Sequence, residues 1–374
     1  MRVISEILLI FLCSSQLLAI REEYKDLFPE FAEYFITGNK RLHTVCRKDP
    51  ECPVKNDELK SGKCLGFEVD CARKLSYSAN RTAFTPPKPG ENWNGDEKWQ
   101  RDNFYQRGDF GYVKERSILH EICTAENEEQ TVLHCSDNLR HCWAKNIFFD
   151  FKNLKVQTST RYREDVIQKG QSGGNCGRFY HDIIRNNMEH LGYLQSWAHE
   201  LQHFTSDPEF RVDPAHCDII FERPTVIIKL DASVNMFHHF CDFVNLFASQ
   251  MINGSFTREI DVLWWDTDRY GFIDNLFGAT WKAFSNRKPV ELISLDQKKV
   301  CFKNALLPLL ARQRFGLFYN TPVVRGCSGS GLFHAFSHHI LNRLEIPQNG
   351  PMLWKNSYHV SGKKYKSSAC PQSR

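Results

Sequence analysis

The sequence lacks a strong excess of charge, a C-x-x-C pair, an internal repeat and any low-complexity tract. Its 374 residues contain 48 Lys and Arg against 44 Asp and Glu, a net charge of +4, so we expect no nucleic-acid partner. The absence of C-x-x-C pairs gives no support to a zinc ribbon or a thioredoxin-like site. Beyond the N-terminus, no apolar run approaches the length that crosses a bilayer, so we expect no stable membrane insertion.

The N-terminus has the features of a secretory signal peptide. Residues 1–19 begin with a basic residue, Arg2, continue with a short apolar stretch and end in small residues near Ala19. The alternative is a membrane anchor, which needs a longer apolar run than this one, interrupted by Ser-Ser-Gln at residues 14–16. We therefore predict that residues 1–19 are a signal peptide.

The fourteen cysteines fit an oxidising compartment. Twelve remain when Cys13 of the signal peptide and Cys370 of the C-terminal tail are set aside. An even number in a secreted chain predicts disulfides, although the sequence does not give their pairing. The cysteines that lie close together in sequence are Cys46/Cys52, Cys64/Cys71 and the group Cys123, Cys135 and Cys142. Two N-x-S/T sequons, at Asn80 and Asn253, predict N-glycosylation.

The most informative stretch predicts a strand, a helix and a second strand. Residues 225–230 are apolar and β-branched, and residues 259–268 are apolar and aromatic before they end in acidic residues. Between them, residues 231–247 have apolar side chains spaced by three and four, as on one face of a helix. That apolar face comprises Val234, Phe237, Cys241, Val244 and Phe247. This order is typical of a βαβ unit in an α/β sheet.

Polar residues follow both predicted strands, where α/β sheets bind their ligands. They are Asp231, Ser233, Asn235 and His238 after the first strand, and Asp266, Thr267 and Asp268 after the second. His238 and Asp242 are four residues apart, so a helix would place them on one face, and a histidine oriented by a carboxylate can act as a general base. The alternative is a polar network that only caps the helix.

The stretch around these residues resembles glycosyltransferase family 61. The family pattern of Asn, His three residues later and Asp four residues further matches Asn235, His238 and Asp242. The similarity covers roughly residues 41–350. It includes residues 44–49, 141–143, 194–197, 217–219, 316–322 and 331–333.

The resemblance implies transfer of N-acetylglucosamine from UDP-GlcNAc to Ser or Thr hydroxyls of EGF-like repeats, such as those of Notch-like receptors, in the endoplasmic reticulum lumen. It implies a catalytic role for His238, Asp242 and Asn235. Asp266 and Asp268 form a D-x-D pattern that would hold the donor diphosphate or a divalent cation such as Mn²⁺; we assign no other metal ligands.

The resemblance also implies a layout with two facing Rossmann-like halves, of which this sequence matches the first. We therefore expect an α/β fold in which a cysteine-bearing N-terminal region, residues 20–175, precedes one Rossmann-like half, residues 176–350. Residues 351–374 are basic and lack periodicity, so we expect them to be unfolded. Because the second half is missing, we expect this chain to transfer little or no sugar. Because the family's C-terminal retention signal is also missing, we expect that the chain can be secreted.

Two alternatives of other classes stay open. The first is a truncated, non-catalytic form that binds only the acceptor. The second is a secreted zinc metalloprotease, because His199-Glu200-Leu-Gln-His203 is an H-E-x-x-H motif. The apolar spacing over residues 191–204 predicts the helix that this motif needs. Further patterns predict strands at residues 144–151 and 290–295, and helices at residues 280–284 and 333–344.

Overall fold

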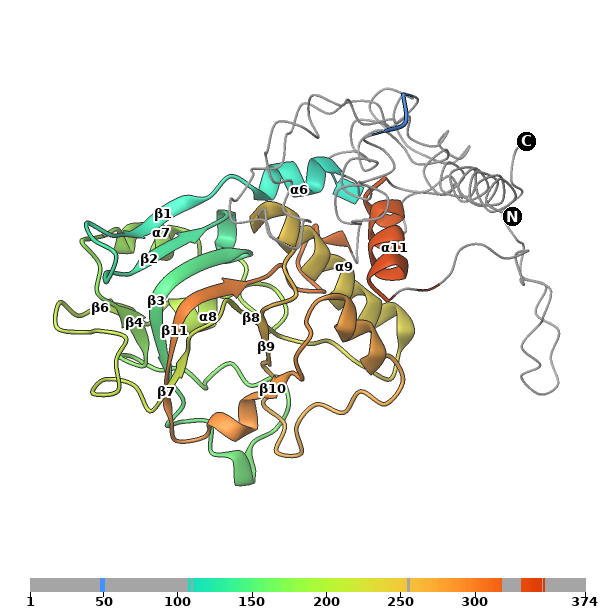
Figure 1. Cartoon of the computed structure of the whole chain (residues 1–374). Coiled ribbons are helices and arrows are strands. Elements are labelled where there is room, and N and C mark those ends of the chain that lie inside the picture. The colour runs from blue at the N-terminus through green and yellow to red at the C-terminus, as the bar shows by residue number, and fades with distance from the viewer. Residues whose placement is uncertain are drawn as a thin grey trace, which may run out of the picture.

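The computed structural model describes residues 48–50, 107, 108, 110–253, 256–317, 331–344 and 346. It confirms the predicted α/β class: helices pack against one mixed sheet with the strand order β10-β9-β8-β11-β3-β2-β1-β5 (Figure 1). The predicted signal peptide, most of the predicted cysteine-bearing region, Asn80 and the C-terminal tail lie outside the described residues.

One half of the sheet is parallel and contains the predicted βαβ unit. Strands β8 (Thr225–Ile228) and β9 (Asp261–Trp264) pair in parallel, and helix α9 (Met236–Asn253) connects them. Strand β10 (Val290–Glu291) extends the parallel half beyond β9, and β11 (Lys299–Leu307) extends it on the other side of β8. The carboxyl ends of these strands therefore lie at one edge of the sheet.

The other half of the sheet is antiparallel and is joined to the first through β3 (Cys142–Asp150), which pairs with β11 along its length. Because β3 precedes residue 175 and β11 follows it, this ladder crosses the boundary that we predicted between residues 175 and 176, so the two predicted regions share one sheet. The remaining strands are β1 (His120–Thr124), β2 (Val132–Cys135), β4 (Ser172–Gly174), β5 (Arg178–Phe179), β6 (Phe204–Ser206) and β7 (Ile219–Phe221). Two of their pairings are parallel, that of β4 with β6 and that of β7 with β11.

Several helices and 3-10 turns complete the described part of the chain. These are α6 (Phe110–Arg116), α7 (His181–Asn186), α8 (Ala198–Leu201), α11 (Gly331–Arg343), η1 (Asp137–Leu139), η2 (Val156–Thr158), η3 (Gly278–Ala283) and η4 (Leu292–Leu295). Helices α6, α9 and α11 lie together on one side of the sheet in Figure 1. None of the helices in the described ranges is long and apolar enough to cross a membrane.

The central strands are buried on both faces, which explains their continuous apolar runs. In β8, Val226 and Ile228 pack into the core that contains α9, whereas Ile227 packs into a second core on the opposite face. In β9, Val262 and Leu263 divide between the two cores in the same way. The alternation follows from the two-residue period of a strand.

Two predicted elements are shorter than their sequence patterns suggested. The helix expected over residues 191–204 is reduced to α8, because Gly192 adopts a φ of +129° and the indole N–H of Trp197 donates to the carbonyl oxygen of Pro308 at 2.9 Å. The strand expected over residues 290–295 ends after β10 and continues as η4. Tertiary packing overrides the apolar spacing in both cases.

Helix α9 also begins later than predicted, at Met236. Val234 therefore lies before the helix and is 81% exposed, and Phe237 in the first turn is 49% exposed. The predicted apolar face is correct for Val244 and Phe247, which are buried. The first residues of the pattern belong to a loop at the edge of the sheet, where they are not part of the core.

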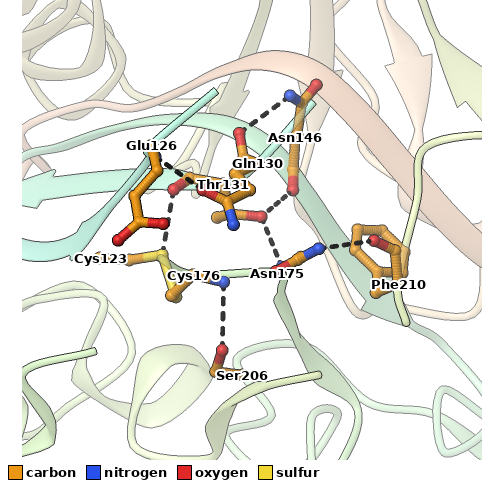
Figure 2. The surroundings of a disulfide bond; sticks show 9 residues. All are labelled: Cys123, Glu126, Gln130, Thr131, Asn146, Asn175, Cys176, Ser206 and Phe210. Atoms are coloured by element: carbon orange, nitrogen blue, oxygen red, sulfur yellow. Dashed lines mark hydrogen bonds between the residues drawn. A yellow bond between two sulfur atoms is a disulfide. The ribbon is translucent and has the colours of Figure 1, made fainter. Parts of the chain in front are cut away.

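Three disulfides are present in the described part of the chain: Cys123–Cys176, Cys135–Cys142 and Cys217–Cys301. Figure 2 shows the first, which lies beside a network in which the Thr131 hydroxyl donates to the Asn146 carbonyl oxygen at 2.5 Å and accepts from the Asn175 N–H at 2.8 Å. These bonds confirm the expected oxidised state for six cysteines. Within the same ranges Cys241 is a free thiol, and burial raises its pKa to about 12, so it is not a reactive thiolate at neutral pH.

We predict that the disulfides differ in their contribution to stability according to the loops they close. The Cys217–Cys301 bond joins residues 84 apart and the Cys135–Cys142 bond joins residues 7 apart. The loss of chain entropy in the unfolded state then predicts a stabilisation of roughly 4–5 kcal/mol by the first bond and of roughly 2 kcal/mol by the second. Urea unfolding of the two double Cys→Ala variants measures the difference, and a larger loss from the Cys135/Cys142 variant would contradict the prediction.

Candidate active site

Three neighbouring parallel strands deliver polar side chains to one edge of the sheet. Asp231 lies three residues after β8, Asp266 two residues after β9, and Arg312 five residues after β11. These strands are adjacent in the order β9-β8-β11. The carboxyl ends of parallel strands form the usual ligand site of an α/β sheet, so the arrangement defines the candidate site.

The centre of the site is a three-residue contact around the Asp231 carboxylate. The Asp231 side chain is fully buried, and its Oδ2 lies 2.8 Å from Nδ1 of His238 and 2.8 Å from Nε of Arg312. Arg312 Nη2 lies 3.1 Å from the same ring nitrogen. We assign the ring proton to Nδ1, which donates to the Asp231 carboxylate and leaves Nε2 as the basic nitrogen. The approach of Arg312 Nη2 to Nδ1 is then a close contact and not a hydrogen bond, because a protonated ring nitrogen cannot accept.

Asn235 caps helix α9. Its Oδ1 accepts a hydrogen bond from the backbone N–H of Phe237 at 3.0 Å and a longer one from that of His238 at 3.4 Å. This is the geometry of an N-cap residue at the start of a helix. Asn235 thereby fixes the first turn of α9, which carries His238.

Asp242, which we predicted as the partner of His238, lies against the next histidine. Its Oδ2 is 3.1 Å from Nδ1 of His239, and both of its oxygens accept from the backbone N–H of Asp231 at 3.2 Å. Nε2 of His239 is 2.7 Å from Asp274 Oδ2. The carboxylate on the His238 ring is that of Asp231, because the chain enters α9 through a loop that folds Asp231 back onto the first turn rather than continuing the helix back to residue 231.

The buried His239 is held between two carboxylates. Burial opposes its charged form, but the hydrogen bonds and charges of Asp242 and Asp274 outweigh that effect and raise the pKa of His239 above its usual value of 6.5. The imidazole ring also packs against Phe243, at 4.5 Å between ring centroids, and Trp281, at 5.9 Å. This cluster ties α9 to the loop after β9.

The D-x-D pattern lies in a turn, and its first carboxylate, that of Asp266, contacts the guanidinium of Arg161. Asp266 Oδ2 lies 3.0 Å from Nε of Arg161, and Asp266 Oδ1 accepts from the backbone N–H of Asp268. Burial raises the pKa of Asp266, and these two contacts offset only part of the shift. Asp268 accepts from the backbone N–H of Tyr270 at 2.9 Å. A guanidinium on the first carboxylate does not suit Mn²⁺, which needs a cluster of unoccupied oxygen ligands.

The sequence analysis missed the segment that closes the site from the side. The Tyr162 hydroxyl donates to the Asp231 carbonyl oxygen at 2.5 Å, and the backbone N–H of Arg163 donates to the Thr267 hydroxyl at 3.0 Å. Arg161 precedes them and pairs with Asp266. No local motif marks these three contacts, since each of them joins residues that are 69 or more positions apart in sequence.

The H-E-x-x-H motif does not lie on one helix. Helix α8 ends at Leu201, before His203, and Glu200 is buried with its Oε2 2.8 Å from Nζ of Lys229. Lys229 is itself fully buried, lies 4.8 Å from the Trp197 ring centroid, and has its pKa lowered by burial against the opposing effect of Glu200. Glu200 therefore neutralises a buried lysine, and in the described ranges no group of three His, Cys, Asp or Glu side chains could hold a metal ion.

Comparison of the sequence with known proteins shows which proteins this chain is similar to. The chain is 41% identical to the EGF domain-specific O-linked N-acetylglucosamine transferase of Bos taurus, over 86% of this chain and 60% of that protein. The transferases of the same name are 40% identical in Gallus gallus, over 87% of this chain and 61% of the relative, and 42% identical in Drosophila melanogaster, over 78% and 56%. This chain spans about three fifths of the length of these relatives. No family model and no solved structure matches the chain.

We predict that His239→Gln destabilises the protein more near pH 6.5 than at pH 9. The change leaves Asp242 and Asp274 buried without their cationic partner, which costs roughly 3–5 kcal/mol. Because the folded-state pKa of His239 is raised, its contribution is lost as the pH rises through that folded value. Burial raises the pKa of Asp242 to about 6, so this carboxyl takes up a proton at lower pH and the comparison is made above that value. Urea unfolding at several pH values from 6.5 to 9 measures the difference in unfolding free energy between wild type and variant; a difference that widens with pH would contradict us.

A second prediction separates the structural role of Glu200 from a metalloprotease role. Glu200→Gln should destabilise the fold by roughly 3–5 kcal/mol, because it leaves the charge of Lys229 buried and unpaired. The double variant Glu200→Gln/Lys229→Met should recover most of that loss. A metalloprotease predicts the opposite, namely an intact fold with abolished hydrolysis, and unchanged unfolding of Glu200→Gln would favour it.

Proposed function

We propose that this site transfers N-acetylglucosamine from UDP-GlcNAc to a Ser or Thr hydroxyl of an EGF-like repeat. The names of the relatives support the proposal, since they describe those proteins as EGF domain-specific O-linked N-acetylglucosamine transferases. The proposal extends to repeats of Notch-like receptors as acceptors and to the endoplasmic reticulum lumen as the compartment. The three disulfides, the two sequons and the signal-peptide pattern of residues 1–19 support a secretory location.

The observation that carries the proposal is the contact of Asp231 with both His238 and Arg312. Asp231 orients the imidazole through Nδ1, so that Nε2 can take the proton of the acceptor hydroxyl. The acceptor oxygen then forms a bond to C1 of the sugar, and the bond from C1 to the β-phosphate oxygen breaks. UDP leaves with that electron pair. The His238 side chain is 24% exposed, which gives a substrate access to the ring.

The leaving diphosphate needs positive charge, and two arginines at the same edge supply it. The side chains of Arg312 and Arg161 are 40% and 37% exposed, although each is anchored to a buried aspartate. An anchored guanidinium is already positioned when negative charge develops, so it stabilises the transition state without reorganisation. Arg161 and Arg312 are therefore proposed to face the diphosphate, in place of a cation on Asp266 and Asp268.

We predict that His238→Gln and Asp231→Asn each lower transfer by about 10²- to 10⁴-fold, the usual contribution of a general base. Asp231→Asn acts indirectly, because an amide at this position can favour the wrong tautomer of His238. The assay joins the chain to the part of a relative that lies beyond the matched region, and incubates the purified protein with labelled UDP-GlcNAc and a folded EGF-like repeat. His216→Gln is the matched control, since His216 and Asp213 form a 2.8 Å pair before β7.

The outcomes separate the competing functions. Normal transfer by folded His238→Gln would remove the proposed base. Binding of the repeat by the wild-type chain without any transfer would overturn the catalytic proposal and favour a protein that only binds the acceptor. Circular dichroism of each variant shows whether a loss of transfer reflects a loss of folding.

A further inference from the structure

Arg140 is a buried arginine that no acidic side chain of the described residues contacts. The residue is 7% exposed, and burial lowers the pKa of its guanidinium. Its Nε is fully buried and has no hydrogen-bond partner, whereas Nη1 and Nη2 retain accessible surface and donate to no described residue. A buried cation is costly when it has no anion beside it, and the two accessible nitrogens can reach one that binds from outside. The guanidinium therefore marks a candidate anion site.

The turn between β2 and β3 holds Arg140 in a fixed position. A disulfide joins the two strands where the turn begins and ends. The backbone N–H of Trp197 donates to the carbonyl oxygen of Leu139 at 2.9 Å, and Nε2 of Gln313 donates to the carbonyl oxygen of Arg140 at 2.9 Å. Gln313 directly follows Arg312, so the turn is tied to the segment that carries an arginine of the candidate active site. A group on such a supported turn is positioned before its ligand arrives.

Arg116, the last residue of α6, adds a second buried positive charge. Its side chain is 5% exposed, its guanidinium carbon lies 3.7 Å from the ring centroid of Tyr112, and its Nη2 donates to the carbonyl oxygen of Phe315 at 3.3 Å. After burial, the charge of Arg116 is the largest cause that lowers the pKa of Arg140. The carboxylate of Glu115 lies 3.4 Å from Arg116, but its side chain is 63% exposed, so solvent screens its charge.

The surplus of positive charge suits a phosphoryl group, which carries up to about two negative charges and several acceptor oxygens, better than a carboxylate with one charge. We propose that Arg140 binds a phosphoryl group through Nη1 and Nη2, and that the charge of Arg116 stabilises the bound anion. The group belongs to a nucleotide diphosphate or to free inorganic phosphate. This site is additional to Arg161 and Arg312 of the candidate active site and does not rest on the proposed transfer reaction.

The test measures binding of inorganic pyrophosphate, UDP and uridine to the full chain by calorimetry and by the shift in Tm. The wild type should bind pyrophosphate and UDP but not uridine, and saturating pyrophosphate should raise its Tm by about 3 °C. Arg140→Gln should weaken binding by about tenfold or more, because it removes charge-assisted hydrogen bonds, and Arg140→Lys should retain part of the affinity. Equal affinity for pyrophosphate and UDP identifies the phosphates alone as the ligand, and tighter binding of UDP identifies a nucleotide. Binding of uridine as tight as that of UDP would overturn the proposal.

Arg185→Gln is the matched control, since it removes an exposed arginine that pairs with Asp182 at 2.6 Å, and it should leave the affinity for pyrophosphate unchanged. Without ligand, Arg140→Gln should leave the Tm unchanged or raise it, because it removes a buried charge that has no partner. A lower Tm without ligand would show a structural role for the guanidinium and overturn the proposal. The proposal is equally overturned if pyrophosphate raises the Tm of wild type and Arg140→Gln by the same amount, or if Arg312→Gln abolishes binding and Arg140→Gln does not. None of these measurements involves sugar transfer, so a failure here is distinct from a failure of the proposed function.

Discussion

The buried carboxylate of Asp231 is the contact on which the candidate site depends. Its Oδ2 joins His238 of α9 to Arg312 beyond β11, its backbone N–H donates to Asp242, and its carbonyl oxygen accepts from Tyr162. Three other segments, namely α9 and the chain around Tyr162 and Arg312, therefore meet at one residue. A buried charge needs partners to be stable, and because Oδ1 has none among the described residues, the contacts of Oδ2 constrain where these segments lie.

The parallel core could be predicted from the sequence because its signals are local. The β-branched run around Val226, the three-residue spacing of Val244 and Phe247 and the apolar run of β9 each follow from the burial of a single element. The prediction that polar side chains lie at the carboxyl ends of the parallel strands is also confirmed for Asp231 and Asp266, since the direction of parallel strands fixes which ends meet.

The partner of His238 could not be predicted because the spacing rule assumes that the helix is already present. An i, i+4 pair would join His238 to Asp242, but α9 begins only at Met236 and the loop before it folds Asp231 back onto the first turn. The carboxylate of Asp242 contacts the adjacent His239 instead. Arg161 and Arg312 carry no local signal at all, because their roles arise from contacts across the sheet.

The antiparallel half explains why such a site can be held firmly by short parallel strands. The long ladder between β3 and β11 fixes the strand that leads to Arg312, and the Cys217–Cys301 bond ties β11 to the segment before β7. Functional groups keep their geometry when the elements beneath them are rigid. In this fold the Cys217–Cys301 disulfide and the antiparallel strands constrain β11, and the side chains of the candidate site that follow β11 and its neighbours are held in place by that constraint.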